Sequence, residues 1–195
     1  MTVQRITRYA AAAAMALGLP VLSACGETPA TDVHDIHDSA AFSRMAGKSP
    51  DLNRQLAELR RVTAPYHNFD AGTAAGWEAR ITPCWEHSDG AMGYHYANPA
   101  YLFDGGRVDL LEPEALMYEP GPGGQMRLVG MEYIVFIDDW TEQDPPELLG
   151  QPFHPHSFLP IYKLHIWLWR DNPRGIFADW NPKVSCAHAD ETESF

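Results

Sequence analysis

The histidines between residues 87 and 165 are the side chains best suited to chemistry in this sequence. Imidazole is the commonest side-chain ligand of zinc and copper, and it exchanges protons near neutral pH. A cluster of these residues would therefore indicate a transition-metal site or an acid–base site. The five histidines are His87, His95, His154, His156 and His165.

His165 lies in a run, residues 161–169, whose aliphatic and aromatic residues predict a strand. Because alternate residues of a strand share a face, His165 is expected on the same side as Trp167 and Trp169. The opposite, aliphatic side is the better candidate for the core. We therefore predict that His165, the two tryptophans and Tyr133 line a ligand pocket or lie under a loop, and core packing of the tryptophans is the alternative.

Glu132 lies in a second predicted strand, residues 126–137, on a face that is otherwise apolar. A carboxylate buried without a partner would be costly, so this side chain needs a counter-charge or a metal ion. Its candidate partners are Arg127, Arg170, a protonated histidine and a metal.

His154 and His156 flank a proline, and in an extended segment both imidazoles would point to one side. That spacing suits one metal ion, whereas the surrounding prolines favour a surface loop that merely holds two histidines. His95 lies in a glycine- and tyrosine-rich run, and the alternative to a ligand is a hydrogen-bonded structural histidine.

Cys84 and Cys186 are the cysteines that remain for the folded domain if Cys25 belongs to the N-terminal leader. Outside the cytoplasm such a pair is expected to form a disulfide, which would tie the start of the domain to its end. Ligation of a metal by two thiolates is the alternative.

The first 24 residues are typical of a secretory signal, with two arginines ahead of a short apolar run. Leu22-Ser23-Ala24-Cys25 resembles a bacterial lipobox, which implies that Cys25 is lipidated and anchors the protein to a membrane. The polar residues 25–48 are expected to form a flexible tether. Gly26 in place of Asp favours the outer membrane or cell surface over retention at the inner membrane of a bacterium.

The chain has 195 residues and a formal net charge of −12. This acidity argues against a nucleic-acid partner, which would require clustered basic residues. Forty-five per cent of the residues are hydrophobic, enough for a real core and too many for a disordered chain.

The positioning elements are predicted to be two helices followed by β-structure. Ser49, Pro50 and Asp51 mark a helix start, a leucine stripe follows, and Asp70 is expected to cap a second helix to Trp77. The predicted fold class is α+β, with this helical pair packed on a mostly antiparallel sheet, rich in loops. The single domain would span residues 49–186 and precede a disordered acidic tail, 187–195. The predicted strands are residues 93–96, 115–119, 126–137 and 161–169.

The leading hypothesis is an extracytoplasmic lipoprotein that binds zinc or copper through histidines. The predicted ligands are His95, His165 and either His154 or His156, with Glu132 as a ligand or as an orienting group and His87 as a weaker candidate. A non-catalytic module that binds a small molecule or carbohydrate, and a purely structural lipoprotein, are the alternatives. Common hydrolase and nucleotide-binding motifs do not occur in the sequence, and the question of enzymatic activity stays open.

Several short motifs together resemble a group of secreted bacterial proteins of similar size and unassigned activity. The resemblance implies a single domain over residues 50–186 and assigns no catalytic residue. The motifs are Cys84 with His87, and the runs 90–96, 128–133, 150–153, 164–169 and 181–186.

Overall fold

The computed structural model describes residues 49–190 and 192–194, all of which belong to one compact unit. The expected signal segment, the tether and Cys25 lie outside the described residues. The helical elements are α2 (Pro50–Thr63), η1 (Ala64–His67), α3 (Phe69–Ala74), α4 (Pro99–Leu102), η2 (Pro122–Gly124) and η3 (Ile137–Asp139). The strands are β1 (Ala79–Arg80), β2 (Cys84–His87), β3 (Gly90–Ala97), β4 (Ala115–Pro120), β5 (Met126–Phe136), β6 (Glu147–Leu148), β7 (Gln151–Pro152), β8 (His154–Pro155), β9 (Ile161–Ile166) and β10 (Thr192–Ser194).

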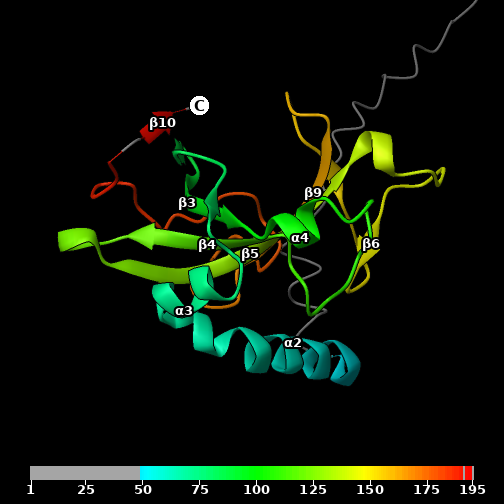
Figure 1. Cartoon of the computed structure of the whole chain (residues 1–195), viewed down its shortest axis with the longest axis horizontal. Helices are drawn as coiled ribbons and strands as arrows, with labels where there is room; N and C mark the ends of the chain where they lie inside the picture. The colour runs from blue at the N-terminus through cyan, green and yellow to red at the C-terminus, as the bar shows by residue number, and fades with distance from the viewer. Residues whose placement is uncertain (1–48, 191, 195) are drawn as a thin grey trace, which may run out of the picture. The chain divides into compact units, whose positions relative to one another are not determined.

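The main sheet has the order β10-β2-β3-β4-β5-β9-β8, with β1 added to β3. Every pairing is antiparallel except that of β10 with β2. Strands β6 and β7 form a separate pair. The predicted α+β class is confirmed, and α2 and α3 lie together on one side of the sheet (Figure 1).

Helix α2 begins where the sequence predicts, because the Ser49 side chain accepts a hydrogen bond from the Leu52 amide. Its leucines at helical spacing are buried. The second helix is shorter than predicted and is capped by Asn68 rather than Asp70. The Asn68 side chain accepts a hydrogen bond from the Asp70 amide, and the helix ends at Ala74.

The two faces of the sheet pack against different parts of the chain. On the helical side, the Phe69 ring of α3 meets the rings of Tyr96 and Tyr118 edge-on. Because side chains alternate along a strand, His95 next to Tyr96 projects from the opposite face. The registers place Glu132 and His165 on that second face, away from α2 and α3.

Strand β9 ends at Ile166, three residues earlier than predicted. After Ile166 the chain crosses β5 over Gly130, where a Cβ atom would lie only 2.6 Å from the Ile166 carbonyl oxygen. The predicted alternation therefore stops before the tryptophans. Trp167 donates its indole N–H to the Ala178 carbonyl, whereas Trp169 donates to Thr63 of α2.

The predicted disulfide between Cys84 and Cys186 is confirmed, and it joins residues 102 positions apart. Residues 187–195 differ from the expected disordered tail because they include β10, which pairs with β2. Just before this strand, Asp190 accepts hydrogen bonds from Arg80 and from the Tyr94 hydroxyl. The C-terminal residues are thus held to the sheet by ionic and backbone contacts.

Within the described part of the chain, the helices are too short or too polar to cross a membrane.

Candidate metal centre

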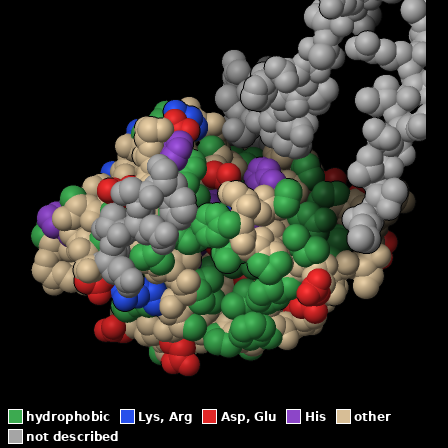
Figure 2. All heavy atoms as spheres, turned by 90° about the horizontal axis from the view of Figure 1, so that it is seen from above, with side chains coloured by type: hydrophobic (Ala, Val, Ile, Leu, Met, Phe, Trp, Pro, Cys, Tyr) green, Lys and Arg blue, Asp and Glu red, His purple; other side chains and the backbone are tan. Residues whose placement is uncertain are grey.

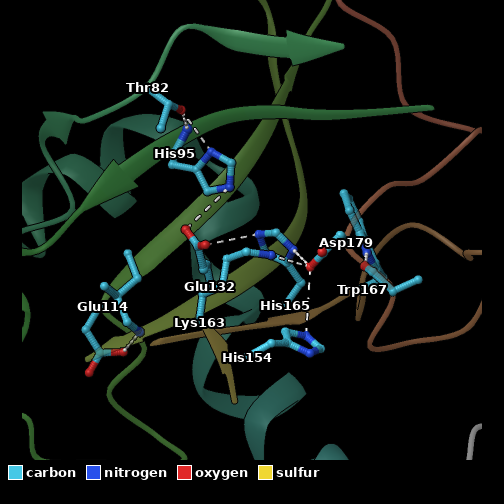
Figure 3. Close-up of polar contacts among 11 residues, drawn as sticks. Thr82, His95, Glu114, Glu132, His154, Lys163, His165, Trp167 and Asp179 are labelled. Atoms are coloured by element: carbon cyan, nitrogen blue, oxygen red, sulfur yellow. Dashed lines mark hydrogen bonds and ion pairs between the residues drawn. The ribbon is translucent and has the colours of Figure 1, made fainter. Parts of the chain in front are cut away.

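Three strands bring two imidazoles and one carboxylate together on the face away from α2 and α3 (Figure 3). Glu132 of β5 is directly paired with His165 of β9, and His95 comes from β3, on the far side of β4. His165 Nε2 lies 3.2 Å from Glu132 Oε1, and His95 Nε2 lies 3.6 Å from Glu132 Oε2. Each residue offers one ligand atom, and these atoms lie within 4.8 Å of one another. This group could hold a metal ion.

The cluster is deeply buried, and its nitrogen atoms are poorly satisfied. The His95 and His165 residues have no exposed surface, and Glu132 is 6% exposed. Nε2 of His95 and both ring nitrogens of His165 form no hydrogen bond of normal geometry with any described residue. Buried polar atoms are rarely left without a partner, so these nitrogens fit metal coordination.

The other nitrogen of each imidazole faces an oxygen atom. Thr82 Oγ1 lies 2.9 Å from His95 Nδ1, and it also accepts a hydrogen bond from the His95 amide. Asp179 Oδ1 lies 3.5 Å from His165 Nδ1. Groups at these positions fix the orientation of metal-binding histidines and favour the tautomer whose Nε2 is free to bind.

Asp179 links the cluster to a second layer of charge. Its carboxylate forms an ion pair with the buried Lys163 of β9, and His154 Nε2 lies 3.9 Å from the same oxygen atom. The neighbouring Lys163 and His165 hold the pKa of Asp179 well below its usual range, although burial acts in the opposite direction. Asp179 is therefore ionised and can orient His165.

The electrostatics of the cluster favour the charge states that a metal requires. Burial would raise the pKa of Glu132, but His95 and His165 outweigh it and lower this pKa to about 2. Burial lowers the pKa of His95 to about 4, despite the attraction of Glu132. For His165 burial is outweighed by Glu132 and Asp179, which raise its pKa. At neutral pH the cluster thus offers a carboxylate and a neutral His95 imidazole.

A cavity of about 310 Å³ reaches Glu132 along the same face of the sheet. Its walls come from the β1–β2 connection, α4, β5 and the loop between β8 and β9. The described residues that line it are Ile81, Thr82, Trp85, Leu102, Glu132, Ile134, Phe136, His156, Phe158, Leu159, Pro160 and Ile161.

The remaining predicted metal ligands lie outside this cluster. His154 approaches it only through Asp179. The His156 ring lies against Trp85 and lines the cavity, so His154 and His156 do not form a joint site. His87 stacks on Trp180 with ring centroids 5.2 Å apart, and its Nδ1 accepts the Asp89 amide.

The residues predicted to form a shared ligand pocket are dispersed in the structure. Tyr133 donates its hydroxyl to the Leu110 carbonyl and lies on the other face of β5 from Glu132. Trp169 packs edge-on against His67 near the end of α2. The two tryptophans and Tyr133 therefore do not surround one cavity, because the strand that would align Trp167 and Trp169 ends before them.

Thr82 and Asp179 were not predicted from the sequence. Asp179 belongs to the segment between two Asn-Pro steps, which is 14 residues beyond His165, and Thr82 precedes His95 by 13 residues. Their contacts depend on the return of irregular segments to the sheet, and strand periodicity carries no signal for that return.

Comparisons of the chain with protein-family models, with curated proteins and with solved structures found no match.

Proposed function

We propose that this protein is an extracytoplasmic lipoprotein that binds one transition-metal ion through His95, Glu132 and His165. Zinc is the expected ion, since two imidazoles and one carboxylate form a donor set known from catalytic zinc sites. Copper(II) accepts the same donors and is the alternative. Three protein ligands would leave one position of a tetrahedral zinc ion for water or another ligand.

The observation that carries the proposal is the pair of buried imidazoles on either side of one carboxylate. Their Nε2 atoms lie 3.2 Å and 3.6 Å from the Glu132 oxygens and lack normal hydrogen bonds to described residues. Thr82 and Asp179 face the opposite nitrogens, as supporting groups do in metal sites. A purely structural cluster would be expected to satisfy these nitrogens by direct hydrogen bonds.

The disulfide between Cys84 and Cys186 supports a location outside the cytoplasm, where such bonds form and persist. Anchoring through a lipid on Cys25 rests on the resemblance of residues 22–25 to a lipobox. Fractionation of cells that express the chain, or its Cys25→Ala variant, tests this part. The unchanged chain should sediment with membranes and the variant should not; equal partition of both would reject the anchor.

The metal is tested with the full chain purified without a histidine tag, exposed to zinc or copper and then dialysed. Elemental analysis should find about one bound ion per chain, since the cluster provides a single three-ligand site. His95→Ala and His165→Ala should each remove that ion. Stoichiometric binding that survives in both variants would reject the assigned ligands.

His87→Ala is the matched control, because His87 lies outside the cluster and stacks on Trp180. The variant should keep the bound ion. Circular dichroism of all variants shows whether a loss of metal reflects a loss of fold. A folded, unchanged chain that retains less than about a tenth of an ion after loading with either metal would make the cluster a buried ion-pair network instead.

A further inference from the structure

The cavity beside Glu132 is polar at one position and apolar along most of its wall. Glu132 is the one carboxylate among its described lining residues. From Glu132 the wall continues along β5 through Ile134 and Phe136, which share its face of the strand, and Ile161 lies opposite Phe136 on β9. A molecule in this cavity would thus meet the candidate metal centre at one place and hydrocarbon side chains elsewhere.

The lining residues include side chains that are unusually exposed for their type. Ile81 is 42% exposed, Phe158 57% and Leu159 40%. Figure 2 shows hydrophobic side chains gathered over one face of the molecule, with histidine side chains at their border. Exposed apolar residues that line a cavity, rather than being scattered singly, are typical of a binding site.

His156 supplies a second polar group to the wall. Its Nδ1 accepts the backbone N–H groups of Phe158 and Leu159, which are on the loop that closes the cavity. A neutral imidazole whose Nδ1 accepts carries its proton on Nε2. The His156 ring therefore has one N–H donor to offer, and it lines the same cavity as Glu132.

The charge of the proposed centre selects the sign of the bound group. A divalent ion with one carboxylate and two neutral imidazoles carries a net charge of about 1+. The carboxylate of Asp179 and the ammonium of Lys163, which pair with each other behind His165, leave that balance unchanged. A single negative charge would neutralise the centre, and a carboxylate oxygen is a suitable zinc ligand.

We propose that the cavity binds a small apolar monocarboxylate, with its carboxylate on the metal held by His95, Glu132 and His165 and its hydrocarbon part along Ile134, Phe136 and Ile161. This inference rests on the proposed metal function and names the class of ligand for the same site. A volume of about 310 Å³ is at the lower end of small-molecule sites, which favours a short chain or a single ring.

The test is calorimetric titration of zinc-loaded chain with butanoate, hexanoate and octanoate. Each added CH₂ that enters the cavity should tighten binding about fourfold. Octylammonium has the same hydrocarbon part and the opposite charge, and it should not bind. Affinities that are independent of chain length, or equal for octanoate and octylammonium, would overturn the proposal.

Leu159→Ser probes the apolar wall, and Leu111→Ser is its control. The two leucines are 40% and 37% exposed, and only Leu159 lines the cavity among these two. Leu159→Ser should weaken octanoate binding about fivefold, whereas Leu111→Ser should change it less than about twofold. Equal effects of the two substitutions would contradict the assigned position of the hydrocarbon chain.

The metal arm separates this inference from the proposed function. Zinc-loaded chain should bind octanoate at least about tenfold more tightly than metal-free chain, because the carboxylate would lose its ligand. Full zinc binding without an octanoate response would overturn this inference alone. A chain that fails to bind zinc or copper would overturn the proposed function, and with it the placement of the carboxylate here.

Discussion

At the scale of single residues, the candidate centre depends on which nitrogen of each imidazole is held. Thr82 faces Nδ1 of His95 and Asp179 faces Nδ1 of His165, so both Nε2 atoms are directed toward Glu132. This arrangement accounts for a histidine pair that is fully buried yet lacks normal hydrogen bonds at Nε2. The supporting oxygens are therefore as informative as the ligands themselves.

Thr82→Val should weaken zinc binding about 10–100-fold, because the variant keeps the shape of the side chain and loses the oxygen that orients His95. Competition with a chromogenic chelator measures the change. Thr82→Ser retains the hydroxyl and should restore most of the affinity. If the valine and serine variants bind zinc equally well, Thr82 does not orient the ligand.

Glu114 is a buried carboxyl group outside the cluster, and it accepts a hydrogen bond from the Ile134 amide. Burial raises its pKa from the ordinary 4.5 to about 8. Between these values the unfolded chain releases this proton and the folded chain keeps it, so the free energy of unfolding falls as pH rises.

Glu114→Gln removes that proton exchange and keeps an oxygen for the Ile134 amide. The free energy of unfolding of the variant should therefore decline less between pH 5 and 8, by up to about 1.4 kcal/mol for each pH unit. Urea unfolding at several pH values measures this difference. Parallel pH profiles for the two chains would show that the Glu114 carboxyl group is not held in its neutral form.

At the scale of elements, the site exists because β3, β5 and β9 contribute to one face of the sheet. The end of β9 is critical, since the chain leaves the sheet one residue after His165 and crosses Gly130. A side chain at residue 130 would displace the Ile166 carbonyl and the strand that carries His165. The glycine thus couples the packing of β5 and β9 to the geometry of the cluster.

Gly130→Ala should lower the free energy of unfolding by about 1–3 kcal/mol and weaken metal binding, because its Cβ would clash with backbone that cannot move freely. Gly121→Ala is the control. Its Cβ would lie 3.4 Å from the nearest atom, in the Gln125 side chain, so it should cost much less. Denaturant unfolding of both variants gives the comparison, and equal losses would contradict the role of Gly130.

The sequence predicts the elements better than their ends and their partners. The leucine stripe and Ser49 correctly indicate α2, and periodicity correctly places β4 and β5 to within about one residue. It also directs attention to His95, Glu132 and His165. It extends β9 too far, since the crossing over Gly130 is a contact between distant segments, and for the same reason it groups Trp167 with His165.

At the scale of the whole molecule, the disulfide and the C-terminal segment enclose the sheet. The bond from Cys84 to Cys186 anchors the segment that carries Asp179, and Trp85 next to Cys84 lies against His95 with ring centroids 6.1 Å apart. In the chain-entropy model a loop of about 100 residues contributes about 4.7 kcal/mol. The cross-link therefore stabilises the fold that holds the candidate centre and the cavity wall together.

The central claim is that one metal ion lies between His95, Glu132 and His165. A crystal structure of zinc-loaded, dialysed chain, with anomalous scattering measured on both sides of the zinc absorption edge, tests it most directly. The account predicts a single strong peak at about 2.0–2.2 Å from Nε2 of each histidine and from a Glu132 oxygen. Full zinc occupancy elsewhere, with the three side chains still in contact with one another, would contradict it.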